Sequence, residues 1–116
     1  METKGSRGKG GDEGGHSWMV QAKGERAGVI YINLIDEPPL GRHASIQIYL
    51  NQKNQGLGIG RVAYLKASEA SRYEVVYAHM RKANVASRRA AEEAGYVDAS
   101  PPGFTQLIMS WNRKRR

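Results

Sequence analysis

The chain of 116 residues is long enough for one domain with a single modest core. It contains no cysteine, which excludes disulfides, thiolate metal ligands and a cysteine nucleophile. Its three histidines lack ligand spacing, so no metal site is predicted, and no run of about 18 apolar residues could span a membrane. The net charge of +7 suits an anionic partner, either a phosphate-bearing ligand or nucleic acid.

The predicted elements alternate between strands and helices. Residues 1–16 hold six glycines and no apolar side chain beyond Met1, which predicts a disordered tail. This N-terminus lacks the apolar core of a signal peptide, so we expect a cytoplasmic protein. A folded domain is predicted over residues 17–112, followed by a basic tail at 113–116. Strands are expected at residues 16–22, 27–35, 43–50, 74–80, 96–97 and 104–111, and helices at 58–71 and 85–94.

A glycine-rich stretch from Asn54 to Arg61, NQGLGIGR, joins the third strand to the first helix. A strand, a glycine loop and a helix N-terminus together direct backbone N–H groups at a phosphate. The stretch is not a P-loop, because Gly60 is followed by Arg61 rather than Lys-Ser/Thr. It also lacks the third glycine of the dinucleotide fingerprint. The alternative is a plain flexible connection before a helix.

A second motif follows the next strand. Residues 84–96, NVASRRAAEEAGY, begin with Asn-x-x-Ser and end with Gly-Tyr. Together with the spacing Gln55-x-x-Gly58-x-Gly60, this resembles the two signatures of the GNAT N-acetyltransferases. The Asn-x-x-Ser form is similar to the branch that acetylates protein N-termini, including those of ribosomal proteins. The resemblance extends over about residues 18–111.

The resemblance implies an α/β fold: a mixed, mostly antiparallel sheet with a central, splayed parallel strand pair and flanking helices. The usual N-terminal strand and helices are expected to be missing, which leaves the acceptor side open or completed by a partner. An exposed final strand at 104–111 makes a homodimer one form of that completion. The implied function is direct transfer of an acetyl group from acetyl-CoA to a primary amine, through a tetrahedral intermediate. That amine is a peptide or protein N-terminus or a small molecule.

The resemblance also implies site residues. Ser87 is the expected acid for the CoA thiolate, with Tyr96 as second choice, because the position of the usual tyrosine holds Ala91. A backbone N–H near Leu50 is the expected oxyanion donor. The residues expected to bind acetyl-CoA are Tyr49, Leu50 and Asn51 along the pantetheine arm, Gln55, Gly56, Leu57, Gly58, Ile59, Gly60 and Arg61 at the pyrophosphate, Asn84 and Ser87 at the arm and thioester, and Arg88 at the 3′-phosphate.

Two questions stay open in the sequence. The general base is not assigned among five candidates, which are Glu25, Asp36, Glu37, His43 and His79. Two other functions also remain. Ala91 and the missing N-terminal helices favour a non-catalytic acyl-CoA-binding module or sensor. The net charge and the basic C-terminus favour a nucleic-acid-binding protein, although no helix-turn-helix or stacking motif supports it.

Overall fold

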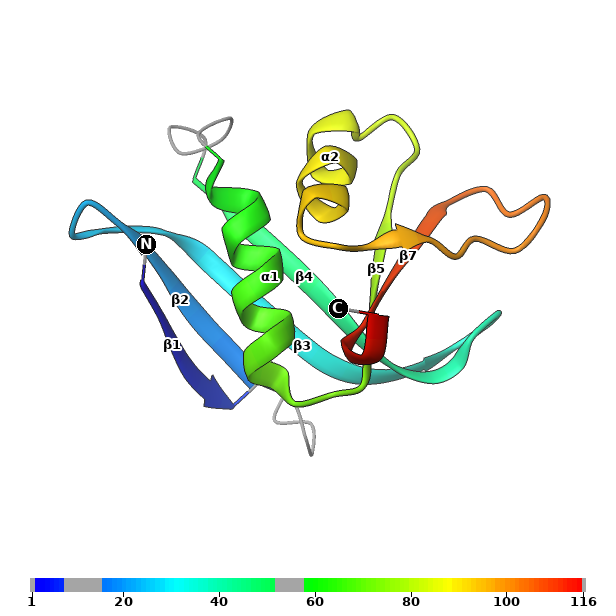
Figure 1. Cartoon of the computed structure of the whole chain (residues 1–116), viewed down its shortest axis with the longest axis horizontal. Helices are drawn as coiled ribbons and strands as arrows, with labels where there is room; N and C mark the ends of the chain where they lie inside the picture. Colours follow the sequence, from blue (N-terminus) through cyan, green and yellow to red (C-terminus); the bar gives the residue numbers. More distant parts are fainter. Residues whose placement is uncertain (1, 8–15, 52–57, 116) are drawn as a thin grey trace.

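Seven strands form one mixed sheet in the computed structural model, which describes residues 2–7, 16–51 and 58–115 (Figure 1). The strand order is β1-β2-β3-β4-β5-β7-β6, and every neighbouring pair is antiparallel except β4 and β5. The strands are β1 (Glu2–Arg7), β2 (His16–Ala22), β3 (Glu25–Glu37), β4 (Gly41–Leu50), β5 (Val75–Met80), β6 (Val97–Asp98) and β7 (Leu107–Asn112). The helices are α1 (Ile59–Ser71) and α2 (Val85–Glu93), and a 3-10 turn follows at Arg113–Arg115. The predicted mixed sheet with one parallel pair is therefore confirmed.

The hairpin of β2 and β3 is determined by the residues of its turn. Lys23 and Gly24 both have positive φ, 55° and 78°, between the paired residues Ala22 and Glu25. A two-residue turn of this kind matches the right-handed twist of the strands that it joins. The hairpin places Ile30 of β3 opposite Trp18 of β2, with both side chains in the core.

The N-terminus differs from the sequence prediction. Glu2–Arg7 form β1, which pairs with all of the strand from His16 to Gln21, so a disordered tail over residues 1–16 is wrong for residues 2–7. Edge-strand pairing uses backbone hydrogen bonds and needs no apolar side chains, so composition alone misses it. Residues 8–15 of that predicted tail lie outside the described residues.

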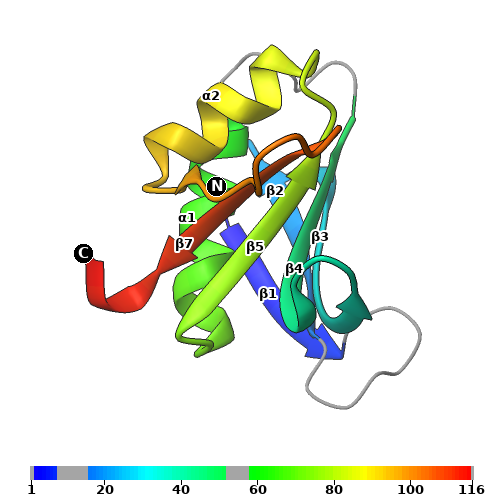
Figure 2. The same cartoon turned by 90° about the vertical axis from the view of Figure 1, so that its right-hand side faces the viewer.

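Both helices lie on the same side of the sheet (Figure 2). Helix α1 contacts β1 to β4, and α2 contacts α1 and β5. The core lies between the sheet and these helices, and its fully buried side chains include Ile30, Ile32, Ala63, Ala67 and Trp111. Within the described residues no helix precedes α1 or covers the opposite face of the sheet.

The C-terminus also differs from the prediction, because Arg113 belongs to the fold and not to a solvated tail. Its guanidinium donates hydrogen bonds to the carbonyl oxygens of Ser68, Glu69 and Tyr73, at 3.1–3.3 Å, and lies over the Trp111 ring. The last turn of α1 carries no basic side chain of its own. Arg113 therefore supplies the positive charge and the donors that a helix C-terminus favours.

The final strand is internal. The sequence predicts an exposed strand at 104–111, whereas β7 lies between β5 and β6 with Leu107 to Trp111 buried. An exposed final strand as the reason for a homodimer is therefore wrong, because the short β6 closes that edge. In the described residues no helix is long and apolar enough to cross a membrane.

Candidate functional site

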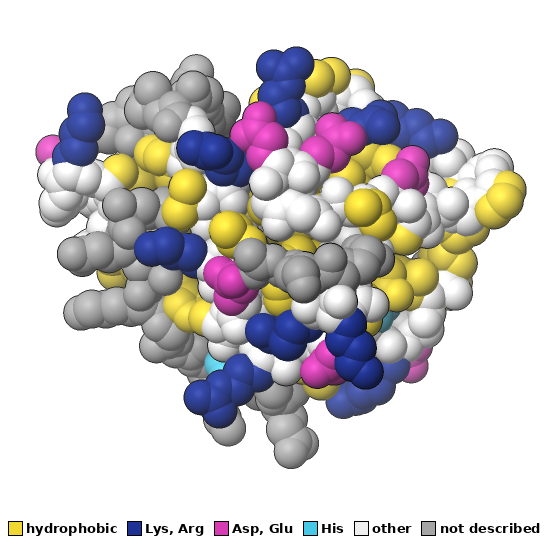
Figure 3. Space-filling view, in the orientation of Figure 1, with side chains coloured by type: hydrophobic (Ala, Val, Ile, Leu, Met, Phe, Trp, Pro, Cys, Tyr) yellow, Lys and Arg dark blue, Asp and Glu magenta, His cyan; other side chains and the backbone are white. Residues whose placement is uncertain are grey.

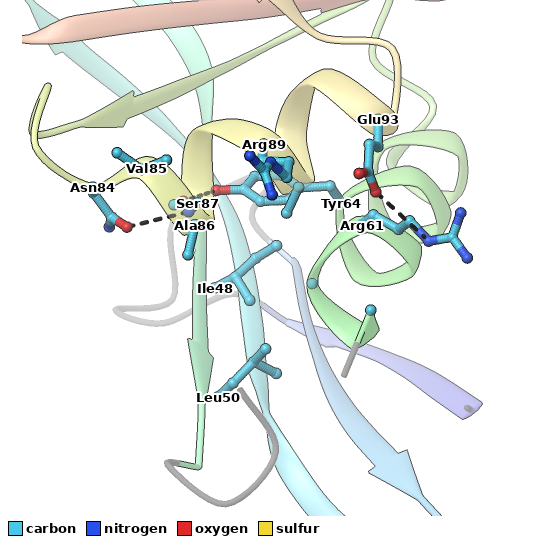
Figure 4. A pocket seen from close by; sticks show the side chains of 13 residues that line it. Ile48, Leu50, Arg61, Tyr64, Asn84, Val85, Ala86, Ser87, Arg89 and Glu93 are labelled. Carbon is cyan, nitrogen blue, oxygen red and sulfur yellow. Dashed lines mark hydrogen bonds and ion pairs between the residues drawn. The ribbon is translucent and has the colours of Figure 1, made fainter. Parts of the chain in front are cut away.

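The site lies where β4 and β5 move apart. These parallel strands form only two register pairs, Ser45 with Tyr77 and Ile46 with Ala78, and then diverge toward their C-terminal ends (Figure 1). A cavity of about 740 Å³ adjoins the divergent part of β4 on the helix side of the sheet. It is lined by Ile48 and Leu50 of β4, by the N-terminal turns of α1, and by α2 (Figure 4). Its volume is in the range of small-molecule sites.

The N-termini of both helices face this cavity. Gly58, which precedes α1, has φ 78° and makes no side-chain capping bond, so the first N–H groups of α1 have no side-chain cap. Asn84 caps α2 as predicted, since its Oδ1 accepts a hydrogen bond from the Ser87 N–H at 3.2 Å. Two helix N-termini at one cavity favour an anionic ligand.

Gly60 lets the two helices approach each other at the cavity wall. A Cβ built on Gly60 would lie 3.3 Å from the Cβ of Ala90 and 4.0 Å from Cδ1 of Leu50. A larger side chain would therefore push α1 away from α2 and enter the cavity.

Two hydroxyl groups meet inside the cavity. The Tyr64 hydroxyl of α1 and the Ser87 hydroxyl of α2 are hydrogen-bonded at 2.8 Å (Figure 4). Burial raises the pKa of Tyr64, and its hydrogen bond with Ser87 partly opposes this effect. Tyr64 therefore keeps its proton at neutral pH. Sequence reasoning missed Tyr64, although it stands four residues after Gly60 and so shares the helix face of the glycine loop.

The charges around the cavity are mixed. Arg61 and Arg89 line it, and the Arg61 Nε lies 3.9 Å from Oε2 of Glu93, which also lines it. On this face of the molecule, described basic and acidic side chains are interspersed rather than gathered into one basic stripe (Figure 3). Arg61 is more than half exposed, so a negatively charged ligand could compete with the Glu93 carboxylate for it.

The sequence of residues 4–96 matches the family model described as the acetyltransferase (GNAT) family. The chain belongs to the GNAT family. No curated protein sequence matches it.

Solved structures of GNAT enzymes share the fold at low identity. A chimera of the spermidine N-acetyltransferase SpeG of Vibrio cholerae and hSSAT has a TM-score of 0.70 and 21% identity, over 90% of this chain and 70% of that one. A ribosomal-protein-alanine N-acetyltransferase of Brucella melitensis has a TM-score of 0.70 and 19% identity, over 86% of this chain and 70% of that one. RimJ of Mycobacterium smegmatis, in complex with CoA-disulfide, has a TM-score of 0.72 and 17% identity, over 90% of this chain and 55% of that one. These similarities establish the fold.

Several residues predicted from the GNAT signatures come together at the cavity. They are Leu50, Gly58, Gly60, Arg61, Asn84 and Ser87. The Ser87 hydroxyl is hydrogen-bonded to the Tyr64 hydroxyl. Gln55, Gly56 and Leu57 of the predicted pyrophosphate loop lie outside the described residues.

The side chains of four other predicted residues do not line the cavity; the backbone contacts predicted for Tyr49, Asn51 and Ile59 stay predictions. Tyr49 is 54% exposed and alternates with the cavity-lining Ile48 and Leu50, so its side chain faces the other side of the sheet. Asn51 is bound to the neighbouring strand, with its backbone N–H on the Ala27 carbonyl and its side chain on the Arg26 carbonyl. Ile59 is packed against the core. Arg88 is ion-paired with Glu92 at 3.8 Å, and it is Arg89 that lines the cavity.

The position of the usual tyrosine and its second-choice substitute both lie away from the cavity. Ala91 is fully buried in the core, and Tyr96 is buried with its hydroxyl against that of Ser68, so neither lines the cavity. The second choice for the acid, Tyr96, therefore lies away from the cavity. Tyr64 reaches the cavity from a different helix.

Proposed function

We propose that this GNAT chain transfers an acetyl group from acetyl-CoA to a primary amine, which is a peptide or protein N-terminus or a small molecule. The observation that supports it most directly is the Tyr64–Ser87 hydroxyl pair inside a cavity at the divergence of β4 and β5. The solved RimJ relative holds CoA-disulfide.

The residues present suit acetyl-CoA as the donor substrate. The N-terminal turn of α1 offers backbone N–H donors, and Arg61 and Arg89 add positive charge for phosphate groups. Ile48 and Leu50 offer apolar contact to the methylene groups of a pantetheine arm. The cavity therefore combines a phosphate-binding end with an apolar wall.

The oxyanion donor that we propose is the backbone N–H of Ile48. Asn51 donates its N–H toward β3, and successive residues of an antiparallel strand direct their N–H groups to opposite edges. The N–H of Ile48, three residues earlier, is thus directed toward β5, beyond the last register pair of β4 and β5. A donor at this edge can stabilise a negatively charged carbonyl oxygen during transfer. The predicted role of the Leu50 backbone stays a prediction.

The proton for the departing thiolate comes from the hydroxyl pair. Tyr64 stays protonated because its pKa is raised by burial, and Ser87 can relay its proton at a hydrogen-bond distance of 2.8 Å. We therefore propose for Ser87 the role of acid that the sequence predicts, with Tyr64 as the source of its proton. This hydroxyl pair favours an enzyme over a non-catalytic acyl-CoA-binding module.

The test is a calorimetric titration with acetyl-CoA, followed by an assay of free CoA thiol with a panel of amines. We expect micromolar binding and release of CoA with at least one amine. Gly60→Leu should weaken acetyl-CoA binding at least tenfold, because its side chain enters the cavity. Lys66→Ala, at an exposed position of the same helix away from the cavity, is the control and should bind normally.

Each other outcome contradicts part of the proposal. Binding without turnover of any amine would support the non-catalytic module. Absence of binding would refute both uses of acetyl-CoA and return attention to nucleic acid as partner. Salt-dependent binding of RNA or DNA would then support that third function.

A further inference from the structure

Two histidines form a hydrogen-bonded pair on the sheet face opposite the helices. His43 of β4 is buried and His79 of β5 is half-buried, and their Nε2 atoms are 2.8 Å apart. The rings of Tyr77 and His43 pack in a T-shaped arrangement, with centroids 5.3 Å apart. The sequence separates the two histidines by 36 residues, so only the parallel pairing of β4 and β5 brings them together.

The hydrogen bonds fix which nitrogen carries each proton. Nδ1 of His43 is 2.7 Å from the carbonyl oxygen of Gly41, which can only accept, so this nitrogen carries a proton. In neutral His43 the Nε2 atom is then an acceptor, and the proton between the rings belongs to Nε2 of His79. The remaining nitrogen, Nδ1 of His79, therefore has a free lone pair in the neutral pair. No described residue donates a hydrogen bond to it.

His79, which carries this lone pair, lies where β4 and β5 begin to diverge. The β4–β5 register ends at Ile46 and Ala78, so His79 and Gln47 are the first residues beyond it. Ile48, next to Gln47, lines the cavity from the helix side. His79 and Ile48 thus lie at the end of the β4–β5 register, with their side chains on opposite faces of the sheet. The hydroxyl pair of Tyr64 and Ser87 lies on the helix side, in the cavity that Ile48 lines.

We propose that Nδ1 of His79 is the general base that removes a proton from the acceptor amine, with His43 as its positioning residue. This inference rests on the proposed acetyl transfer. The amine nitrogen forms a bond to the acetyl carbonyl carbon, its proton goes to Nδ1 of His79, and the carbon–sulfur bond breaks. The thiolate takes its proton from the Ser87–Tyr64 pair, which regains a proton from solvent, and His79 returns its proton to solvent. Base and acid thus act from opposite faces of the sheet.

The surroundings keep His79 neutral and able to accept a proton. Burial lowers the pKa of His79, a charged His43 would lower it further, and the Glu37 carboxylate opposes both effects. Tyr77 lies against His43, and the strand on the far side places apolar Ile108 beside His79. A weak base of this kind suits an α-amino group, with a pKa near 8, better than an alkyl ammonium near 10.4.

The kinetic test uses the full chain, acetyl-CoA and a short peptide with a free α-amino group. His79→Gln should lower kcat about 100-fold or more, and should remove the acid limb of the kcat pH profile. His43→Phe should lower kcat by a smaller factor, and His43→Gln should recover part of it, because an amide oxygen can accept from His79. The control is His16→Gln, on the helix side of the sheet, which should leave kcat unchanged.

A second readout does not depend on turnover. Nitrogen chemical shifts of the imidazoles in the wild-type chain should show His79 protonated at Nε2 and His43 at Nδ1. The opposite tautomer of His79 overturns the inference, as does an unchanged kcat and pH profile in a folded His79→Gln chain. A wild-type chain that binds no acetyl-CoA or acetylates no amine refutes the proposed function itself, which is a different outcome.

Discussion

The hydroxyl pair of Tyr64 and Ser87 makes the sharpest prediction, because one substitution separates its chemical role from its structural role. Tyr64→Phe removes one hydroxyl and keeps the ring, which is 6% exposed and packed edge-on against Tyr96. One neutral hydrogen bond of 2.8 Å is lost. Since Ser87 lines an open cavity, water can replace the missing partner, so the cost in unfolding free energy is about 1 kcal/mol.

The catalytic effect should be much larger than this stability loss. A general acid contributes on the order of 100-fold or more, so we expect kcat to fall about 100-fold in Ser87→Ala and by a comparable factor in Tyr64→Phe. The double variant should fall little further, because the two hydroxyls act as one relay. The melting temperature should fall by about 4 °C in Tyr64→Phe. The assay is release of CoA thiol under saturating acetyl-CoA, together with thermal unfolding. Full kcat in both single variants, or additive losses in the double variant, would refute the relay.

Three further predictions concern stability. Arg113→Met should lower the free energy of unfolding, measured in urea, by about 2 kcal/mol, because the carbonyl groups that end α1 lose a charged donor. The control is Lys114→Met, at an exposed position, which should change the free energy of unfolding by no more than about 0.5 kcal/mol. Gly28→Ala should cost about 3 kcal/mol or more by the same measurement, because its Cβ would lie 2.1 Å from the carbonyl oxygen of Tyr49. For His79, the lowered pKa means that the unfolded chain binds more protons just below pH 6.5, so stability should fall as pH drops from 7.5 to 5.5, and less steeply in His79→Gln. Equal slopes in the two chains would contradict this reasoning.

Local sequence signals predicted most of the fold. Alternation of apolar residues placed β2 at residues 16–22, as observed, and the glycine loop and Asn84 marked the starts of both helices. These features depend on residues close together in the chain. The sequence did not predict β1 or the interior position of β7, because strand pairing depends on partners that are not adjacent in the sequence.

The site divides in the same way. The residues of the two motifs reached the cavity, since a motif fixes its own geometry at a helix N-terminus. Tyr64 and the His43–His79 pair were out of reach, because each functions through a contact between elements, at sequence separations of 23 and 36 residues. For Arg113, composition indicated only a charge, and the structure shows a cap for α1.

The two register pairs between β4 and β5 divide the sheet into two halves. One half consists of β1 to β4 with α1, the other of β5, β7 and β6 with α2. The halves meet through that short ladder, the contact of the two helices, the His43–His79 bond, and the bonds of Arg113 and Tyr96 to α1. A molecule bound in the cavity would contact both halves and stabilise their association. At 100 times its Kd, such a molecule raises the unfolding free energy by about 2.7 kcal/mol. Amide hydrogen exchange in β5 should then slow, so the donor substrate would complete the fold as well as take part in the reaction.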